Sequence, residues 1–391
     1  MFSFSFTSFF IILVAALFFS LLSKRFHLPW VISLIIAGVV IGDTGFQLVT
    51  VDPVLNFFAE IGLVFLMFLA GLETKLSSIV EIRAKAFLFV LLNGLFPFFV
   101  GFCLAYYFGF GLIPSILFGT VFSSTSVAVL VPFLDAHKTV HKRCGSLLLA
   151  GTVIEDITSL LILSLLLQFT ARETSLPLPL FYTSAIILVF LFRLAIPKLR
   201  EYLTKSRRNT IFRSLSSSSF ETELRVAIVI LIGSVILFEL IGFHAVVGGF
   251  MAGLILSEFF ASKELFNKIH VLGYGLFVPI FFVVVGLTLQ LDAVATSFRT
   301  ILLVLSASIL AIFVKLLGGY IAGRVEGYSR KDSSFLGWAT VPRLTTSFAV
   351  AYAGLQFGLV SELFVTTVVV ISVTTTFVGS LVMNALTSTR K

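Results

Sequence analysis

The 391-residue chain is poor in charge and in cysteine. Charged residues make up 12% of it, about half the share that is usual in a soluble globular protein. Its two cysteines, Cys103 and Cys144, lie in an apolar segment and beside a basic loop, and they predict neither a disulfide framework nor a metal site. Hydrophobic residues reach 58%, and the mean hydropathy is +1.12. This composition excludes an ordinary soluble domain and indicates a protein embedded in lipid.

Apolar runs of roughly 17–25 residues, long enough to cross a bilayer, recur along the whole chain. We therefore expect an all-α polytopic membrane protein in which residues 1–391 form one unit without a soluble regulatory domain. The first run has no basic residue before it and no small-residue cleavage site after it, which favours a retained span over a signal peptide. The thirteen expected spans are 8–23, 29–46, 52–71, 84–108, 111–134, 144–169, 178–198, 224–241, 243–260, 270–290, 298–323, 334–357 and 361–387.

Basic residues gather in alternate loops between these spans. The opposite loops hold only Arg172 and Arg299. By the positive-inside rule, the N-terminus is expected outside and the C-terminus in the cytoplasm. The net charge of +8 is then a consequence of topology, and we expect no nucleic-acid partner. The basic loops contain Lys24/Arg25, Lys75/Arg83/Lys85, Lys138/Lys142/Arg143, the stretch from Lys198 to Arg213, Lys263/Lys268 and Arg324/Arg330/Lys331.

Three short motifs recur in the same order in the two halves of the chain. They pair spans that are seven apart, an odd number, so the second copy must lie inverted in the membrane, as in many secondary transporters. We expect an extra span at 8–28, a five-helix repeat at 29–170, linker spans at 171–242 and the inverted repeat at 243–391. The pairs are AGVVIGD at 37–43 with AGLILSE at 252–258, GLETKL at 71–76 with GLTLQL at 286–291, both offset by 215, and STSVAV at 124–129 with TTSFAV at 345–350, offset by 221.

The last pair marks two helices that we expect to be interrupted and to cross. Four hydroxyl residues, Ser123 to Ser126, occupy the centre of the fifth span, and the twelfth contains a proline, which removes a helical hydrogen bond. Hydroxyl groups can satisfy backbone groups that an interruption frees, and the freed carbonyls can coordinate a cation. The alternative is that the hydroxyl clusters only help helices to pack. The residues expected to line the two breaks are Ser124, Thr125, Ser126, Pro342, Arg343, Thr345 and Thr346.

Two adjacent acids, Glu155 and Asp156, lie inside the sixth span. Each ionised carboxylate at the membrane midplane costs about 2.5–3.5 kcal/mol, so the pair needs water or a partner. Neighbouring carboxyl groups titrate as a coupled unit, and a carboxylate that exchanges a proton for a cation suffices for antiport. Lys315, deep in the eleventh span, is the expected partner of Glu155; the alternative is a lysine that reaches the interface. The second copy has Thr374 to Thr376 at this depth and no acid, which predicts one carboxylate site per chain.

Together these motifs resemble the monovalent cation:proton antiporter superfamily, in the branch of bacterial Na+/H+ and Kef-type K+/H+ exchangers. The resemblance covers nearly the whole chain. It is carried by the ordered set LPWVISLIIAGVVIGDTGF, IGLVFLMFLAGLETKL, VFSSTSVAVLV, VIEDI, HAVVGGFMAGLILSE, VPIFFVVVGL and KLLGG.

The resemblance implies a secondary transporter in the bacterial plasma membrane, without a cofactor and without enzyme activity. It implies that a bundle of spans 4–6 and 11–13 moves against the other spans, usually in a homodimer. Asp156 is then the carboxylate that alternately binds the proton and the cation, with Na+ as the first candidate and Li+ and K+ after it. Glu155 is its neighbour, pairing with Lys315 in one state. Two acids at this position imply electrogenic exchange.

Two departures from the family pattern affect the site. The first acid is Glu155, where sodium exchangers of this branch usually have Asp. The twelfth span reads Pro342-Arg343-Leu344-Thr345, where the family often has Pro-Arg-Gly-Glu, so Arg343 lacks its usual local partner.

Two other functions remain as alternatives. A sodium-coupled symporter of an organic anion on a related fold would need a roomy cavity and usually has fewer buried acids. An intramembrane aspartyl protease would need two aspartates on different helices, typically with a Gly-x-Gly-Asp motif, which the sequence lacks.

Overall fold

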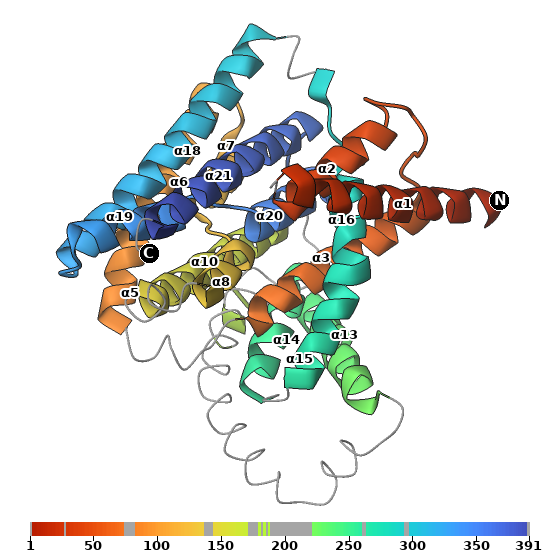
Figure 1. Cartoon of the computed structure of the whole chain (residues 1–391), viewed down its shortest axis with the longest axis horizontal. Helices are drawn as coiled ribbons and strands as arrows, with labels where there is room; N and C mark the ends of the chain where they lie inside the picture. The colour runs from red at the N-terminus through yellow and green to blue at the C-terminus, as the bar shows by residue number, and fades with distance from the viewer. Residues whose placement is uncertain are drawn as a thin grey trace, which may run out of the picture.

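The structure is a computed structural model of the whole chain, and it describes residues 2–26, 29–73, 83–136, 144–170, 179–180, 183–184, 187, 221–259, 263–292 and 297–388. Within these residues it is helical throughout and contains no strand (Figure 1). The helices are α1 (Phe2–Phe26), α2 (Trp30–Ile41), α3 (Pro53–Leu72), α5 (Arg83–Val90), α6 (Phe96–Tyr107), α7 (Leu112–Ser123), α8 (Val127–Ala136), α10 (Ser146–Thr170), α13 (Thr222–Ile241), α14 (Ala245–Phe259), α15 (Lys263–Leu272), α16 (Val278–Leu287), α18 (Phe298–Val325), α19 (Arg330–Ala339), α20 (Thr345–Gln356) and α21 (Glu362–Ser388). Two π-helical turns, η1 (Leu91–Leu95) and η3 (Gly273–Phe277), join α5 to α6 and α15 to α16.

Nine helical stretches in the described chain are long and apolar enough to cross a membrane, and α2 and most of α14 form shorter apolar helices. Each predicted span except that at 178–198 coincides with a described helix or helix pair. The span at 178–198 lies mostly outside the described residues, and so does the basic stretch from Lys198 to Arg213. The prediction of an all-helical polytopic protein is confirmed.

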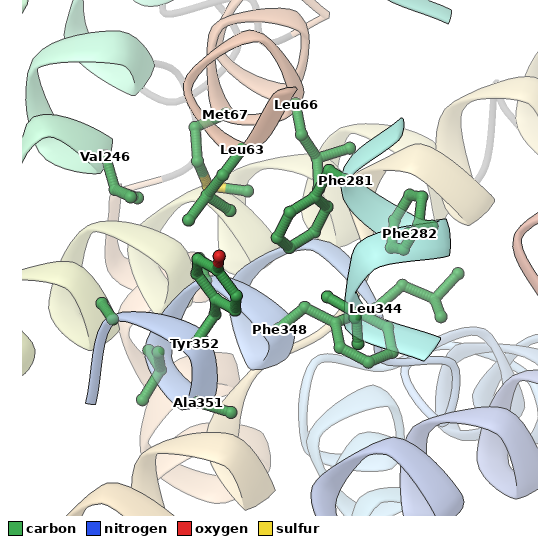
Figure 2. Packing of buried hydrophobic residues seen from close by; sticks show 14 of the residues in the cluster. Leu63, Leu66, Met67, Val246, Phe281, Phe282, Leu344, Phe348, Ala351 and Tyr352 are labelled. Carbon is green, nitrogen blue, oxygen red and sulfur yellow. The ribbon is translucent and has the colours of Figure 1, made fainter. Parts of the chain in front are cut away.

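The helices form two groups (Figure 1). One contains α5 to α8, α10 and α18 to α21, and we call it the broken-helix group, because α7–α8 and α19–α20 are each one interrupted helix. The other contains α1 to α3 and α13 to α16, and we call it the glycine-packed group. The two groups meet where α20 faces α3 and α16 (Figure 2).

Close backbone contacts at glycines hold the second group together. A Cβ atom built on Gly38 of α2 would lie 2.1 Å from Val283 O and 2.7 Å from Gly286 Cα of α16. A Cβ built on Gly71 of α3 would lie 2.2 Å from Phe250 O of α14. Such separations exclude any side chain, so α2 packs on α16 and α3 on α14 by backbone contact, as small residues allow in membrane proteins.

The contact between the two groups is apolar at its centre. Tyr352 and Phe348 of α20 pack edge-on against Phe281 and Phe282 of α16, with ring centroids 5.5 Å apart in both pairs (Figure 2). Leu63, Leu66 and Met67 of α3 complete the buried surface. An apolar contact of this kind has no directional bonds, so it can rearrange without exposing unpaired polar groups.

Two hydrogen bonds border this apolar contact at the N-terminal end of α3. The Tyr352 hydroxyl donates to Asn56 Oδ1 at 2.7 Å, and Gln356 Nε2 donates to Glu60 Oε1 at 2.7 Å. Both pairs have i, i+4 spacing on their helices, so the two bonds lie on one face of α20 and one face of α3. They link the two groups on one side of the membrane.

The glycine contacts give a testable expectation for stability. Replacing Gly253 of α14 by alanine puts a Cβ 2.1 Å from Phe68 O, a backbone atom that cannot move aside cheaply. We expect Gly253→Ala to lower the unfolding midpoint in detergent, with a loss of about 1–3 kcal/mol typical of overpacking. Gly233→Ala on α13 is the control, because a Cβ there meets nothing within 4 Å. Equal midpoints for the two variants would contradict the packing argument.

Candidate functional site

The two interrupted helices meet at their breaks. Residues 124–126 separate α7 from α8, and residues 340–344 separate α19 from α20. The backbone N–H of Ser126 donates to Pro342 O at 2.9 Å, and the hydroxyl groups of Ser124 and Ser347 lie 2.7 Å apart. The residues predicted from the hydroxyl clusters and the proline therefore line one crossing point, although they are more than 200 positions apart in the sequence.

The second break has a local cause, and the first leaves backbone groups that need partners. Pro342 has no N–H, and its ring disfavours helix at the preceding residue. Ser124 is extended, with φ −72° and ψ 150°. The last carbonyls of α7 then have no helical partner. The ammonium group of Lys315 in α18 donates a hydrogen bond to one of them, Ser123 O, at 2.5 Å. A cation at a helix C-terminus also interacts favourably with the helix dipole.

The same ammonium group forms a buried ion pair. Lys315 Nζ lies 2.9 Å from Glu155 Oε2 of α10, and both side chains are fully buried, at 0% exposure. Thr125 of the first break donates to the same carboxylate oxygen at 2.7 Å and accepts from Lys315 at 2.9 Å. Lys315 therefore lies inside the protein and does not extend to the membrane interface. Glu155 is bonded at both oxygens, because Asn93 Nδ2 donates to Oε1 at 2.9 Å.

Asp156 has a different environment from its neighbour. It is buried, and Thr346 in the first turn of α20 donates to its Oδ1 at 2.5 Å. Its Oδ2 is also buried and has no hydrogen-bond partner among the described residues. A carboxylate near a helix N-terminus is stabilised by the dipole, but a buried oxygen without a donor is costly. One oxygen of Asp156 is thus held in place, and the other has lone pairs for a proton or a cation.

Each of the two acids on α10 accepts a hydrogen bond from a different break. Thr125 and Thr346 are at matching positions of the motifs STSVAV and TTSFAV, and each donates to one acid. The first break contacts Glu155, and the second contacts Asp156. Side chains of adjacent helical residues point about 100° apart, which allows one helix to present its two acids to two partners.

Arg343 is fully buried in the second break. Its Nη2 donates to Ala311 O of α18 at 2.9 Å, and its guanidinium lies 5.2 Å from the ring centroid of Phe122. Nε and Nη1 have no hydrogen-bond partner within the described chain, and Arg343 forms no ion pair there. Thr345, next to it, is buried and its hydroxyl oxygen likewise has no described partner. Arg343 adds a second buried positive charge near the two acids.

Sequence reasoning missed two members of this cluster. Asn93, in the π-helical turn η1, binds Glu155, and Thr340, the first residue of the second break, donates to Asn93 Oδ1 at 3.0 Å. Both are fully buried. The one available signal was that Asn93 is the single amide in the predicted span at 84–108, where apolar residues flank it on both sides.

Comparison with known proteins decides the family. The transmembrane sodium/hydrogen exchanger family matches residues 10–388. The chain belongs to the sodium/hydrogen exchanger family. The resemblance found from the motifs is thereby confirmed, and the exchanger is a multi-pass membrane protein.

Individual relatives cover nearly the whole exchanger. It is 32% identical to a probable Na+/H+ antiporter of Methanocaldococcus jannaschii over 96% of its length and 95% of the relative. It is 31% identical to a Na+/H+ antiporter of Enterococcus hirae over 96% of each chain. The Na+/H+-K+ antiporter GerN of Bacillus cereus is 25% identical over 91% of this chain and 89% of its own.

A solved structure supports the fold. The sodium proton antiporter MjNhaP1 from Methanocaldococcus jannaschii superposes with a TM-score of 0.65, covering 96% of this chain and 94% of that one, at 18% identity. The exchanger therefore has the helical arrangement of that antiporter.

The buried ion pair predicts how variants respond. Lys315→Met leaves Glu155 as a buried charge without its cation, and we expect a loss of about 3–5 kcal/mol of stability. Glu155→Gln combined with Lys315→Met removes both charges, and the glutamine can still bind Asn93 and Thr125, so the unfolding midpoint in detergent should largely recover.

The control for these variants is Lys268→Met. Lys268 pairs with Glu221 and Glu264 where solvent reaches all three side chains, and a change there should have little effect. A double variant no more stable than Lys315→Met alone would contradict the argument that the unpaired buried carboxylate causes the loss of stability.

Proposed function

We propose that the exchanger is a secondary active antiporter that moves a monovalent cation against protons, with Asp156 as the carrier. The supporting observation is the contrast within the acid pair. Glu155 is engaged at both oxygens by Asn93, Thr125 and Lys315, whereas Asp156 Oδ2 is buried without a described donor. A proton or a cation at Oδ2 would each satisfy the same lone pairs, so the two compete for one site. The named relatives are Na+/H+ antiporters, and GerN is named for K+ as well, so Na+ is the first candidate, with Li+ and K+ next.

The transport cycle we propose is alternating access. The broken-helix group carries Asp156 and moves against the glycine-packed group across the apolar contact of α20 with α3 and α16 (Figure 2). Because the contact is apolar at its centre, displacement exchanges one set of van der Waals contacts for another. The acid then faces each side of the membrane in turn.

Inverted repeats are the architecture that we propose for this movement. The offset of 215 carries Gly38 to Gly253 and Gly71 to Gly286. It therefore maps the contact between Gly38 and Gly286 onto the contact between Gly253 and Gly71, and both are close backbone contacts. Two equivalent contacts formed by exchanged partners are what a two-fold axis between repeats would produce.

The orientation, coupling and assembly complete the proposal. We place the N-terminus outside and the C-terminus in the cytoplasm of a bacterial plasma membrane, on the basis of the basic loops. Exchange is electrogenic, with more protons than cations moved, so that the membrane potential contributes about 2.3 kcal/mol per charge per 100 mV. The family resemblance supports a homodimer in the lipid bilayer, without a cofactor.

The family match favours this function over both alternatives. The curated relatives described above are named antiporters, which gives no support to a sodium-coupled symporter of an organic anion. The two acids are adjacent on α10 and bind different partners, so they do not share a water between two aspartates as a protease would.

Removing the carrier acid tests the proposal. In proteoliposomes that contain a pH-sensitive dye, we expect Asp156→Asn to reduce Na+-, Li+- or K+-dependent proton movement by at least 100-fold, because the amide can neither exchange a proton nor hold the cation. Asp43→Asn is the control, since Asp43 is exposed in the turn after α2. Wild-type exchange by Asp156→Asn would contradict the assignment of the carrier.

Cross-linking tests the relative movement of the two groups. In a Cys103→Ser, Cys144→Ala background, Glu60→Cys with Gln356→Cys places one thiol on each group, in place of two side chains that are joined by a hydrogen bond of 2.7 Å. A short bifunctional thiol reagent that joins the two cysteines should then reduce exchange at least 10-fold. If the reagent contains a disulfide, cleavage of the cross-link by a reductant should restore exchange.

The matched control for the cross-link joins two positions within one group. Glu221→Cys with Lys268→Cys replaces an ion pair of 2.8 Å inside the glycine-packed group. A cross-link there should leave exchange unchanged. Full exchange by the cross-linked Glu60/Gln356 pair would contradict the proposed movement.

A further inference from the structure

Asn93 lies at a contact point of three elements of the broken-helix group. It is fully buried in η1, the π-helical turn between α5 and α6. Its Nδ2 donates to Glu155 Oε1 of α10 at 2.9 Å, and its Oδ1 accepts from Thr340 Oγ1 of the second break at 3.0 Å. π-helical turns inside α-helices often occur at functional sites.

The surrounding backbone is packed so that Asn93 reaches this position. A Cβ built on Gly318 of α18 would lie 2.4 Å from Leu92 O and 3.1 Å from Asn93 Cα. Gly318 is one turn after Lys315, so the missing side chain lets η1 approach α18 next to the ion pair. Gly94 is also close to the site, because a Cβ there would lie 3.5 Å from Glu155 Cγ.

The orientation of the Asn93 amide follows from its two partners. The NH2 group donates to Glu155 Oε1, which places the amide oxygen next to the Thr340 hydroxyl, a group that also lies 2.9 Å from Gly337 O. An NH2 group only donates, so Glu155 Oε1 is the acceptor of this bond. Asn93 therefore supplies the hydrogen bond that keeps Oε1 satisfied while Lys315 binds Oε2.

We infer that Asn93 is a positioning residue that holds Glu155 as the counter-ion of Lys315 and so leaves Asp156 available to the transported ion. Without the amide, Glu155 Oε1 is a buried oxygen that lacks its donor, which weakens the hold of this carboxylate on Lys315. The ammonium group is then free to compete with the cation for Asp156. The inference rests on the proposed function, and it adds a role for a residue that does not touch Asp156.

The test separates cation affinity from maximal rate. Asn93→Leu keeps a similar side-chain volume and removes the donor. In proteoliposomes, we expect the apparent KM for Na+ to rise about 10-fold, with the maximal rate within about 2-fold of wild type. A general packing defect would lower the maximal rate and the unfolding midpoint without a selective change in KM. Thr367→Val on α21 is the matched control, because this buried hydroxyl donates only to Leu363 O of its own helix.

A second measurement asks whether Asn93 acts through Glu155. In the Glu155→Gln background, we expect Asn93→Leu to change KM by less than 2-fold, because the carboxylate that it positions is gone. An unchanged KM in the single variant, or an equal rise in both backgrounds, would overturn the inference. If Asn93→Leu does not fold, Thr340→Val takes its place. We then expect the KM for Na+ to rise about 3-fold, and an unchanged KM would overturn the inference.

These results are independent of the test of the carrier. Loss of exchange in Asp156→Asn together with a wild-type KM in Asn93→Leu would reject the positioning role and leave the antiporter in place. Wild-type exchange in Asp156→Asn would reject Asp156 as the carrier, the part of the proposed function on which the positioning role depends.

Discussion

Lys315 and Glu155 form the interaction on which the centre of this protein depends. One ammonium group contacts the carboxylate, the hydroxyl of Thr125 and the last carbonyl of α7, so it supports a helix end and neutralises an acid at the same time. In a membrane interior, neither a free helix terminus nor a lone carboxylate is tolerated cheaply. The interruption of α7–α8 and the presence of an acid on α10 are therefore linked, since each supplies part of what the lysine needs.

The adjacent acids have different surroundings, and carboxyl chemistry alone would not separate them. Thr125 and Thr346 occupy matching positions of the two related motifs and donate to Glu155 and Asp156 respectively. Only Glu155 also receives Lys315 and Asn93. Two related breaks around one α10 helix thus produce an unequal pair, in which one acid is fixed and the other has an oxygen with no donor in the described chain.

Hydropathy, loop charge and hydroxyl clusters were sufficient to predict the helical fold, the positions of both breaks and the residues near them, because each leaves a local mark in the sequence. Lys315 was predicted as a partner of Glu155 because a buried charge demands one. Asn93 and Thr340 could not be found in this way. A π-helical turn depends on how α18 packs at Gly318, and the approach of Thr340 depends on how two distant segments cross, so neither leaves a periodic signal. The repeat offsets had already singled out the segments that contain four packed glycines. They did not predict that Gly38 would contact Gly286 and that Gly71 would contact Gly253.

The location of the charges is compatible with the movement that we propose for this site. Glu155 and Asp156 on α10, Lys315 on α18 and Arg343 in the second break all belong to the broken-helix group. A displacement of this group against α3 and α16 therefore leaves the ion pair and its hydrogen bonds intact. The centre of the surface that slides in this movement is formed by Phe281, Phe282, Phe348 and leucine side chains, which lose little when one apolar contact replaces another (Figure 2). The two hydrogen bonds at its border, from Tyr352 to Asn56 and from Gln356 to Glu60, would have to break. Had any of the four charges been on the other group, each cycle would have separated buried ions, at a cost of several kcal/mol per ion. Keeping the charges together on one side of an apolar contact is what makes a movement of the whole site compatible with its burial.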